Sequence, residues 1–176
     1  MEFTTLDAFN EVWYDEVVKS VRREFSAMQP IQFDEPKYSK KQITKAGRAL
    51  AVVDDLQQAE EPLAILDNWR AAHAYPLSVI AGKLAEIAPD AMVVQRLKRL
   101  DSIWGKLKRF PDMDLARMQD LGGCRAIVQS ISEIYKTVES YKEAETNCIL
   151  KREYDYVQNP KTSGYRSYHV VYQFFD

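Results

Sequence analysis

The pattern of apolar residues changes near Met92, and this change constrains the fold more than any other feature of the sequence. Before Met92, apolar residues recur at spacings of three and four, which is typical of amphipathic helices. The first such series comprises Leu6, Phe9, Trp13, Val17 and Val21. After Met92, short runs rich in β-branched and aromatic residues alternate with helix-like segments. The sequence therefore predicts a helical region over residues 1–90 and a region of strands and helices over residues 91–176.

Within the helical region, a proline-containing connector over residues 30–40 precedes a predicted helix over 41–58. A third helix follows Pro62, and Pro76 is expected to break or restart it. After residue 91 the predicted strands cover 92–98, 122–128, 149–157 and 165–175, and the predicted helices cover 100–109 and 132–143. Strand 122–128 is expected to be buried.

Composition excludes several classes of protein. The chain has 176 residues with 46% hydrophobic and 28% charged residues, which is typical of a folded globular domain rather than a disordered chain. The net charge of −2 predicts no overall attraction to nucleic acid or to a membrane surface, so any basic site must be local. Neither a signal peptide nor an apolar span is present, and Cys124 and Cys148 form no CxxC pair. A cytoplasmic protein with no membrane partner is expected.

Basic residues gather between Arg96 and Arg109. If residues 94–98 are extended, Arg96 and Lys98 share one face, because side chains alternate along a strand. If a helix begins near Leu100, one stripe of it carries Ser102, Lys106 and Arg109. Such cations, together with a hydroxyl group, could neutralise a polyphosphate with directed donors. The alternative is an ordinary solvated basic face.

Asp120 precedes a strand of small residues that includes Gly122, Gly123 and Arg125. A carboxylate at the start of such a strand is well placed to hold Mg²⁺, which takes one or two protein carboxylates and leaves its other positions to water and phosphate. The two glycines would allow close approach of a nucleotide to the backbone. Without context, Asp120 could equally cap a turn.

The C-terminal segment carries a turn between Pro160 and Gly164 that leads into a strand. One face of that strand presents Tyr165, Ser167 and His169, beside Lys161. The other face is predicted to be core and consists of Tyr168, Val170, Tyr172 and Phe174. A nucleotide base could stack on Tyr165 with its phosphates near Lys161. Ordinary sheet aromatics with one satisfied histidine are the alternative.

Taken together and in this order, the three segments resemble the synthetase domain of RelA/SpoT-type (p)ppGpp synthetases. The resemblance covers roughly residues 92–176 and rests on matching spacing in three motifs. The matching motifs are Arg96-x-Lys98-x-x-x-Ser102-x-x-x-Lys106-x-x-Arg109, Asp120-Leu-x-x-x-Arg125 and Asp155-Tyr-x-x-x-Pro-Lys161-x-x-Gly-Tyr165-x-Ser-x-His169.

The resemblance implies an α+β fold with a nucleotidyltransferase-like mixed β-sheet flanked by helices, and a GTP diphosphokinase that uses ATP, GDP or GTP, and Mg²⁺. Pyrophosphate would pass from ATP to the 3′-hydroxyl of a guanosine nucleotide, as in the stringent response. By the family pattern, Asp120 is the catalytic metal ligand. The ATP site would comprise Arg96, Lys98, Ser102, Lys106, Arg109 and Arg125. The acceptor site would comprise Lys161, Tyr165 and His169.

The sequence also departs from the family pattern. No counterpart of the family's Glu-x-Gln-Ile-Arg-Thr-like strand precedes Asp176, so we expect a C-terminally incomplete synthetase core with weak or no turnover. Ser163 replaces the asparagine of many relatives, which leaves the acceptor open. A toxin-type enzyme that modifies the tRNA 3′ end and a nucleotide-binding module without catalysis are the alternatives. A homo-oligomer is compatible with the sequence.

Overall fold

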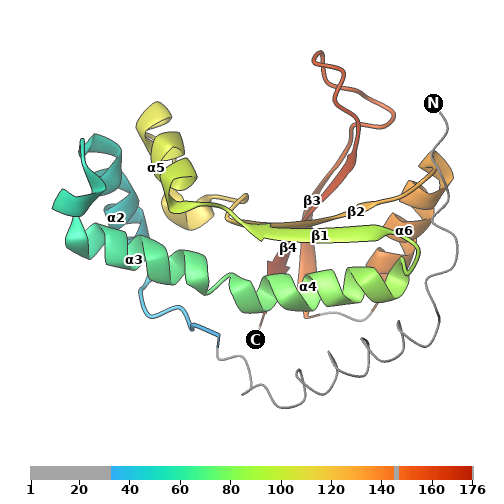
Figure 1. Cartoon of the computed structure of the whole chain (residues 1–176), viewed down its shortest axis with the longest axis horizontal. Helices are drawn as coiled ribbons and strands as arrows, with labels where there is room; N and C mark the ends of the chain where they lie inside the picture. Colours follow the sequence, from blue (N-terminus) through green and yellow to red (C-terminus); the bar gives the residue numbers. More distant parts are fainter. Residues whose placement is uncertain (1–32, 145–146, 176) are drawn as a thin grey trace, which may run out of the picture. The chain divides into compact units, whose positions relative to one another are not determined.

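The computed structural model describes residues 33–144 and 147–175, which belong to one compact unit. The helix predicted around Leu6–Val21 lies outside these residues, and the boundary predicted between residues 90 and 91 remains a prediction. The elements are α2 (Lys40–Val52), η1 (Leu56–Gln58), α3 (Glu60–Ala71), α4 (Ala74–Ile87), β1 (Met92–Leu97), α5 (Leu100–Arg109), η2 (Leu115–Arg117), β2 (Gly122–Ile127), α6 (Ile131–Glu143), β3 (Cys148–Asp155) and β4 (Tyr168–Phe174) (Figure 1). The predicted α+β class is confirmed.

Helix α2 begins with a capping box. The Ser39 hydroxyl accepts from the backbone N–H of Gln42, and the Gln42 side chain accepts from the backbone N–H of Ser39, which satisfies two N–H groups left free at a helix start. One face of α2 buries Ile43 and Leu50. This face contacts α3, α5 and η2, so these four elements share one apolar core.

Close packing in this core requires a glycine in α2. A Cβ atom built on Gly47 would lie 2.6 Å from the Cβ of Leu115 in η2, closer than real Cβ contacts allow. Next to this contact, the Thr44 hydroxyl donates to Asp114 Oδ1 at 2.7 Å. Asp114 also caps η2 by accepting from the N–H of Ala116 at 3.0 Å. The absence of a side chain at residue 47 thus brings η2 against α2.

Residues 60–87 form two helices, which confirms the restart expected near Pro76. Helix α4 begins at Ala74, so Pro76 occupies its first turn, where its missing N–H costs no intrahelical bond. Helix α4 contacts β1 and β2 and runs along them in Figure 1. In the described residues, no helix combines the length and apolar character that a membrane crossing requires.

Strands β1 and β2 pair antiparallel, in the register Met92↔Ile127 to Leu97↔Gly122. The expectation that the second strand is buried is wrong, because its residues alternate between exposed and half-buried. A Cβ atom built on Gly122 would lie 3.7 Å from Cδ2 of Leu77 in α4. The face of the sheet on which this Cβ would stand is therefore the one that α4 covers. Helix α4 thus covers one face of the β1–β2 sheet, and Arg125 lies on the open face.

Strands β3 and β4 also pair antiparallel, with an irregularity between Leu150 and Arg152. The mixed β-sheet expected from the resemblance is absent from residues 33–144 and 147–175, whose four strands form two separate two-stranded sheets. A mixed sheet needs a parallel ladder, whereas here each strand pairs only with an antiparallel neighbour. Aromatic side chains attach β4 to the helices: Tyr75 of α4 meets Phe174, and Tyr141 of α6 meets Tyr172.

Strand β4 is shorter than predicted, and its second face is not wholly core. It begins at Tyr168 because a turn precedes it: Gly164 adopts φ 81°, and the N–H of Lys161 donates to the Tyr165 carbonyl at 3.2 Å. Val170, predicted to be core, is 38% exposed. The irregular pairing beside Leu150 disturbs the strict alternation on which that prediction depended.

Candidate active site

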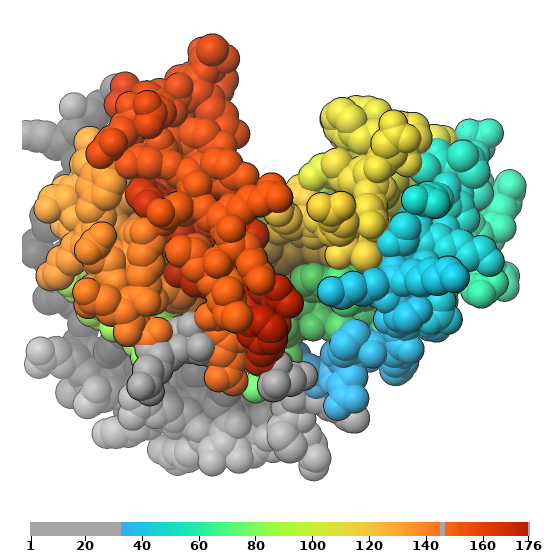
Figure 2. Space-filling model, turned by 180° about the vertical axis from the view of Figure 1, so that it is seen from behind, coloured from blue at the N-terminus to red at the C-terminus, as the bar shows by residue number. Residues whose placement is uncertain are grey.

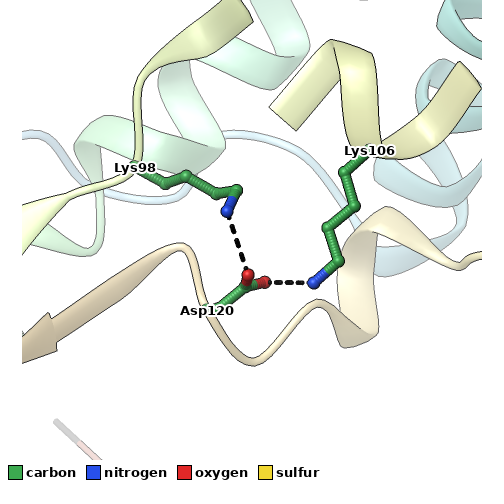
Figure 3. A network of polar contacts seen from close by, with 3 residues as sticks. All are labelled: Lys98, Lys106 and Asp120. Atoms are coloured by element: carbon green, nitrogen blue, oxygen red, sulfur yellow. Dashed lines mark hydrogen bonds and ion pairs between the residues drawn. The ribbon is translucent and has the colours of Figure 1, made fainter. Parts of the chain in front are cut away.

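Asp120 lies between two lysines that come from the end of β1 and from α5 (Figure 3). Lys98 Nζ donates to its Oδ2 at 3.1 Å and Lys106 Nζ donates to its Oδ1 at 2.8 Å. Partial burial acts to raise the pKa of Asp120, but the hydrogen bonds and charges of the two lysines outweigh burial and lower the pKa below its ordinary 3.8. The carboxylate is therefore ionised at neutral pH and holds both ammonium groups.

The backbone of Lys98 is fixed on both sides. Its N–H donates to the Leu121 carbonyl at 2.7 Å, which extends the β1–β2 pairing by one residue. Its carbonyl accepts from Arg70 Nε of α3, also at 2.7 Å. These bonds place Lys98 opposite the segment that carries Asp120.

Helix α5 carries Lys106 on the stripe that the sequence predicts. Ile103 and Leu107 are 0% and 1% exposed and attach the helix to the core shared with α2. Trp104 Nε1 donates to the Leu50 carbonyl at 3.0 Å and fixes the rotation of the helix. Ser102 and Arg109 are exposed, and Lys106 is half-buried, so α5 presents a polar edge to solvent.

Two of the predicted arginines lie on the open face of the two-stranded β1–β2 sheet. Directly paired residues of antiparallel strands share a face, and the pairs here are Val94↔Arg125 and Arg96↔Gly123. Both arginines are exposed. Gly123 adds no side chain beside Arg96, so solvent or a ligand can reach the guanidinium group.

The predicted acceptor residues come together at the end of the β3–β4 ladder, where His169 pairs with Tyr154 and Lys161 and Tyr165 lie in the loop before β4. A hydrogen bond of 2.7 Å joins Tyr165 Oη and His169 Nε2, and Lys161 Nζ lies 5.4 Å from the Tyr165 ring centroid. Burial lowers the pKa of His169 first, and the charges of Lys161 and Arg125 lower it further. The neutral imidazole is thus favoured at neutral pH.

The contacts form two groups. The first contains Asp120 with its two lysines, and the second contains Tyr165 with Lys161 and His169. In the described part of the chain, no hydrogen bond or ion pair joins Asp120 to Tyr165. The charge of Arg125 on β2 contributes to the lowered pKa of His169 in the second group. In Figure 2 the surface is hollowed between α5, in yellow, and the orange-red segment of β3 and its following loop.

Two side chains matter more than the sequence suggested. The ring of Tyr156 contacts Lys161, Tyr165 and His169. Arg70, 28 residues before Lys98 in the sequence, donates a hydrogen bond to the Lys98 carbonyl and so fixes the backbone there. The Tyr154–Tyr156 alternation at the end of a predicted strand was the available signal for the first; for the second, the sequence offered only an arginine in an aromatic helix.

Asp155, the other acidic residue of the three motifs, has a structural position. Its Oδ1 accepts from the N–H groups of Val157 and Gln158, both at 2.9 Å, and its Oδ2 accepts from the Tyr135 hydroxyl at 3.0 Å. These hydrogen bonds lower its pKa, with the Gln158 N–H contributing most. Asp155 therefore fixes the turn after β3.

Asp120 is the carboxylate that suits a metal ion. Among the described residues no group of three or more His, Cys, Asp or Glu side chains could hold a metal on its own. Mg²⁺ needs only one or two protein carboxylates when phosphate oxygens and water complete its octahedron. The Asp120 side chain is 46% exposed, so its oxygens are accessible to such an ion. The residues present thus fit Mg²⁺ delivered with a polyphosphate.

Comparisons with known proteins agree with the motif pattern. Residues 95–175 match the family model described as a region found in RelA / SpoT proteins. GTP pyrophosphokinase YwaC of Bacillus subtilis is 37% identical over 61% of this chain and 59% of its own length, and GTP pyrophosphokinase YjbM of the same species is 34% identical over 48% and 40%. A GTP pyrophosphokinase of Haemophilus influenzae is 32% identical over 54% of this chain and 12% of its own.

Solved structures show the same relationship. Small alarmone synthetase 2 from Bacillus subtilis superposes with a TM-score of 0.54 at 28% identity, over 61% of each chain. A GTP pyrophosphokinase family protein from Streptococcus pneumoniae gives a TM-score of 0.51 at 26% identity, over 57% of this chain and 55% of the other. This chain thus spans at most about three fifths of the relatives it matches. These matches support a RelA/SpoT-type synthetase domain over residues 95–175.

Proposed function

We propose that this protein is a GTP diphosphokinase of the (p)ppGpp synthetase kind, transferring pyrophosphate from ATP to the 3′-hydroxyl of GDP or GTP in a stringent response. The observation that carries the proposal is the placement of Asp120 between Lys98 and Lys106. Two ammonium groups and one carboxylate at the same point suit a polyphosphate that arrives with a divalent cation. The relatives named GTP pyrophosphokinase support the same reaction.

On the ATP side, the two lysines would exchange Asp120 for phosphate oxygens. Ser102 on α5 and Arg125 on the open face of the β1–β2 sheet would add a hydroxyl and a guanidinium group to the same phosphates. Arg96 and Arg109 are exposed and carry planar guanidinium groups that suit stacking on adenine. Asp120, released from the lysines, would hold Mg²⁺.

On the acceptor side, Tyr165 would stack on guanine, and Lys161 and His169 would contact the acceptor phosphates. Tyr165 is 44% exposed, so its ring is accessible. Without a nucleotide, Lys161 lies over this ring. Binding of guanine would therefore replace the lysine on the tyrosine face and turn it toward the phosphates.

The reaction forms one bond and breaks one. The acceptor 3′-oxygen attacks the β-phosphorus of ATP, its proton is released, and the bond between the β-phosphorus and the α,β-bridging oxygen breaks so that AMP leaves. Such a transfer depends on alignment and on neutralising charge rather than on covalent help from the protein. Bound Mg²⁺ would supply Lewis-acid neutralisation of the phosphate oxygens. The lysines and arginines would orient ATP, and Tyr165 would orient the acceptor.

Incubation of the chain with ATP, Mg²⁺ and separate acceptors tests the proposal. GDP and GTP should stimulate release of AMP above the ATP-only control, with appearance of ppGpp or pppGpp; deacylated tRNA should not. A response to tRNA alone would favour the toxin-type reaction. Binding of ATP without release of AMP under any acceptor would instead support a nucleotide-binding module.

Asp120→Asn tests the metal role, with Asp112→Asn as the matched control. Asp112 is exposed on the loop that follows α5. We expect Asp120→Asn to reduce AMP release by about 100-fold or more while the control stays within about twofold, because removing a group that stabilises charge in a transition state has effects of this size. Equal rates for the two variants would exclude Asp120 from the chemistry.

A further inference from the structure

The ring of Tyr156 contacts all three predicted acceptor residues. Lys161 Nζ lies 4.5 Å from its ring centroid, closer than the 5.4 Å to the Tyr165 ring. The His169 ring meets it edge-on, with centroids 5.3 Å apart and an interplanar angle of 89°. The Tyr165 ring lies 6.1 Å away at 65°.

The position of this ring is fixed by the backbone and by a neighbour. The N–H of Tyr156 donates to the Ser167 carbonyl at 2.9 Å, which continues the pairing of the two segments beyond β3 and β4. Asp155 fixes the turn that follows, as described above. Tyr154 stacks parallel to Tyr156, with centroids 5.8 Å apart and an interplanar angle of 4°. The ring is therefore held before any ligand arrives.

Such a fixed ring can order two mobile neighbours. A lysine ammonium is attracted to the face of a tyrosine ring, and an aromatic edge packs favourably on a neighbouring ring. Lys161 has four rotatable side-chain bonds and is exposed, so without Tyr156 its ammonium would sample many positions. Without Tyr156, the imidazole of His169 would also lose the ring on which it packs. That contact supports His169 while it makes its hydrogen bond with the Tyr165 hydroxyl.

We propose that Tyr156 is a positioning residue of the acceptor site, which holds Lys161 and His169 in place for the acceptor's phosphates. The inference rests on the proposed function, because it assigns those phosphates to the two side chains. Tyr156 acts through its ring rather than through its hydroxyl. Its effect is on the acceptor and not on ATP, since the contacts described above join it to the acceptor group alone.

Three variants of the full chain test this role: Tyr156→Leu, Tyr156→Phe and the control Tyr75→Leu. Tyr75 is a half-exposed tyrosine whose ring meets β4 at Phe174, away from the acceptor group. We measure GDP and ATP dissociation constants by calorimetry, and the acceptor KM and kcat where AMP release is detected. Circular dichroism and thermal melting check that each variant is folded.

We expect Tyr156→Leu to weaken GDP binding about tenfold, because Lys161 and His169 both lose the ring on which they pack, and to leave ATP binding unchanged. Tyr156→Phe should restore GDP affinity to within about twofold, since the ring is kept. Tyr75→Leu should leave both affinities unchanged. Equal GDP affinity in the unsubstituted chain and in Tyr156→Leu would overturn the inference, as would loss of ATP and GDP binding together in a folded variant.

A double-substitution cycle distinguishes positioning from general support of the fold. If Tyr156 acts partly through Lys161, then Tyr156→Leu should reduce GDP affinity less in a Lys161→Met background than in the unsubstituted chain, and the remaining effect should come from His169. Fully additive effects would show that the ring does not act through the lysine. Failure of the unsubstituted chain to bind GDP at all would overturn the proposed function itself, and this inference with it.

Discussion

The two sides of the candidate site are built differently. On the proposed ATP side, Asp120 forms ion pairs with Lys98, directly after β1, and with Lys106 of α5, next to a core of helices. On the proposed acceptor side, Lys161, Tyr165 and His169 surround the ring of Tyr156 at the end of a two-stranded sheet. Charge holds the first group together, and aromatic contacts hold the second.

This difference separates the two sides experimentally. Ion pairs between partly exposed side chains weaken as salt rises, because the Debye length falls from about 10 Å at 0.1 M to about 3 Å at 1 M. Contacts between aromatic rings depend on area and geometry and respond much less to salt. Because the two groups have separate contacts, substitutions among Asp120 and its lysines should change ATP binding and spare GDP binding. Substitutions around Tyr156 should do the reverse.

The largest expected effect is that of Lys98→Met combined with Lys106→Met. Loss of two directed cations should weaken ATP binding by about 100-fold, as two charge-assisted contacts are removed, and leave GDP binding within about twofold. Lys108→Met is the matched control, because Lys108 lies on the same helix but pairs with the exposed Asp54. Calorimetry at low and high salt measures both affinities. A matching loss of GDP affinity would show that the two sides are not independent.

Gly47→Ala should destabilise the fold by about 1–3 kcal/mol, because overpacking in a tight contact has this cost. The added methyl group would lie against Leu115 and push η2, and with it the segment before Asp120, away from α2. Urea denaturation measures the change. Gly82→Ala in α4 is the control: its Cβ meets nothing within 4 Å, so about 0.5–1 kcal/mol of stabilisation is expected.

If Gly47→Ala left the free energy of unfolding unchanged, η2 would be free to shift without cost. In that case, the ATP side would not depend on the helical core. If the ATP side does depend on the helical core, Gly47→Ala should lower ATP affinity more than GDP affinity.

A smaller effect is expected of Tyr165→Leu. Loss of a stacking ring removes about 1–3 kcal/mol per base in nucleic-acid complexes, so GDP affinity should fall about tenfold with this exposed ring, and ATP affinity should not change. Tyr75→Leu again serves as control. Competition between GDP and ATP analogues measures both constants, and an unchanged GDP affinity would remove Tyr165 from the acceptor site.

The smallest effect concerns pH. The pKa of Asp120 lies below 3.8 in the folded chain, so its pairing stabilises the fold above that value, and the stabilisation is lost as pH falls through the lowered pKa. Because the carboxylate is about half exposed, screening keeps the effect small. The stability difference between the unsubstituted chain and Asp120→Asn should therefore shrink between about pH 7 and about pH 3. A difference that grows on acidification would contradict the direction of this shift.

Periodicity predicted the local elements well. The helix expected over 100–109 has those bounds in the structure, and strand β1 ends one residue before its predicted limit. Periodicity did not predict features that depend on contacts between distant parts of the chain. The start of β4 depends on the turn around Gly164, and the exposure of β2 depends on α4 covering one face only. Local periodicity could not predict whether the strands form one mixed sheet or two antiparallel pairs. Strand pairing joins residues that are far apart in the sequence.

The candidate site divides in the same way. The stripe on α5 that carries Lys106 follows from helical spacing, since Ile103 and Leu107 had to face the core. The pairing of Lys106 with Asp120 does not follow from spacing, because the loop through η2 brings the two together. The role of Tyr156 depends on the pairing of its backbone with Ser167, which no local pattern specifies.

The carboxylate between the two lysines has a consequence for selectivity. Asp120 acts as an internal substitute for phosphate, so the ammonium groups are already ordered and compensated before a ligand binds. A simple anion that took both lysines would leave this carboxylate without a counter-ion, which is unfavourable in a partly buried position. A metal-bound polyphosphate would avoid this cost, because its phosphates would pair with the two lysines and its metal ion would pair with Asp120. On the proposed function, the site should thus discriminate against inorganic phosphate and AMP, and admit the magnesium complex of a nucleoside triphosphate.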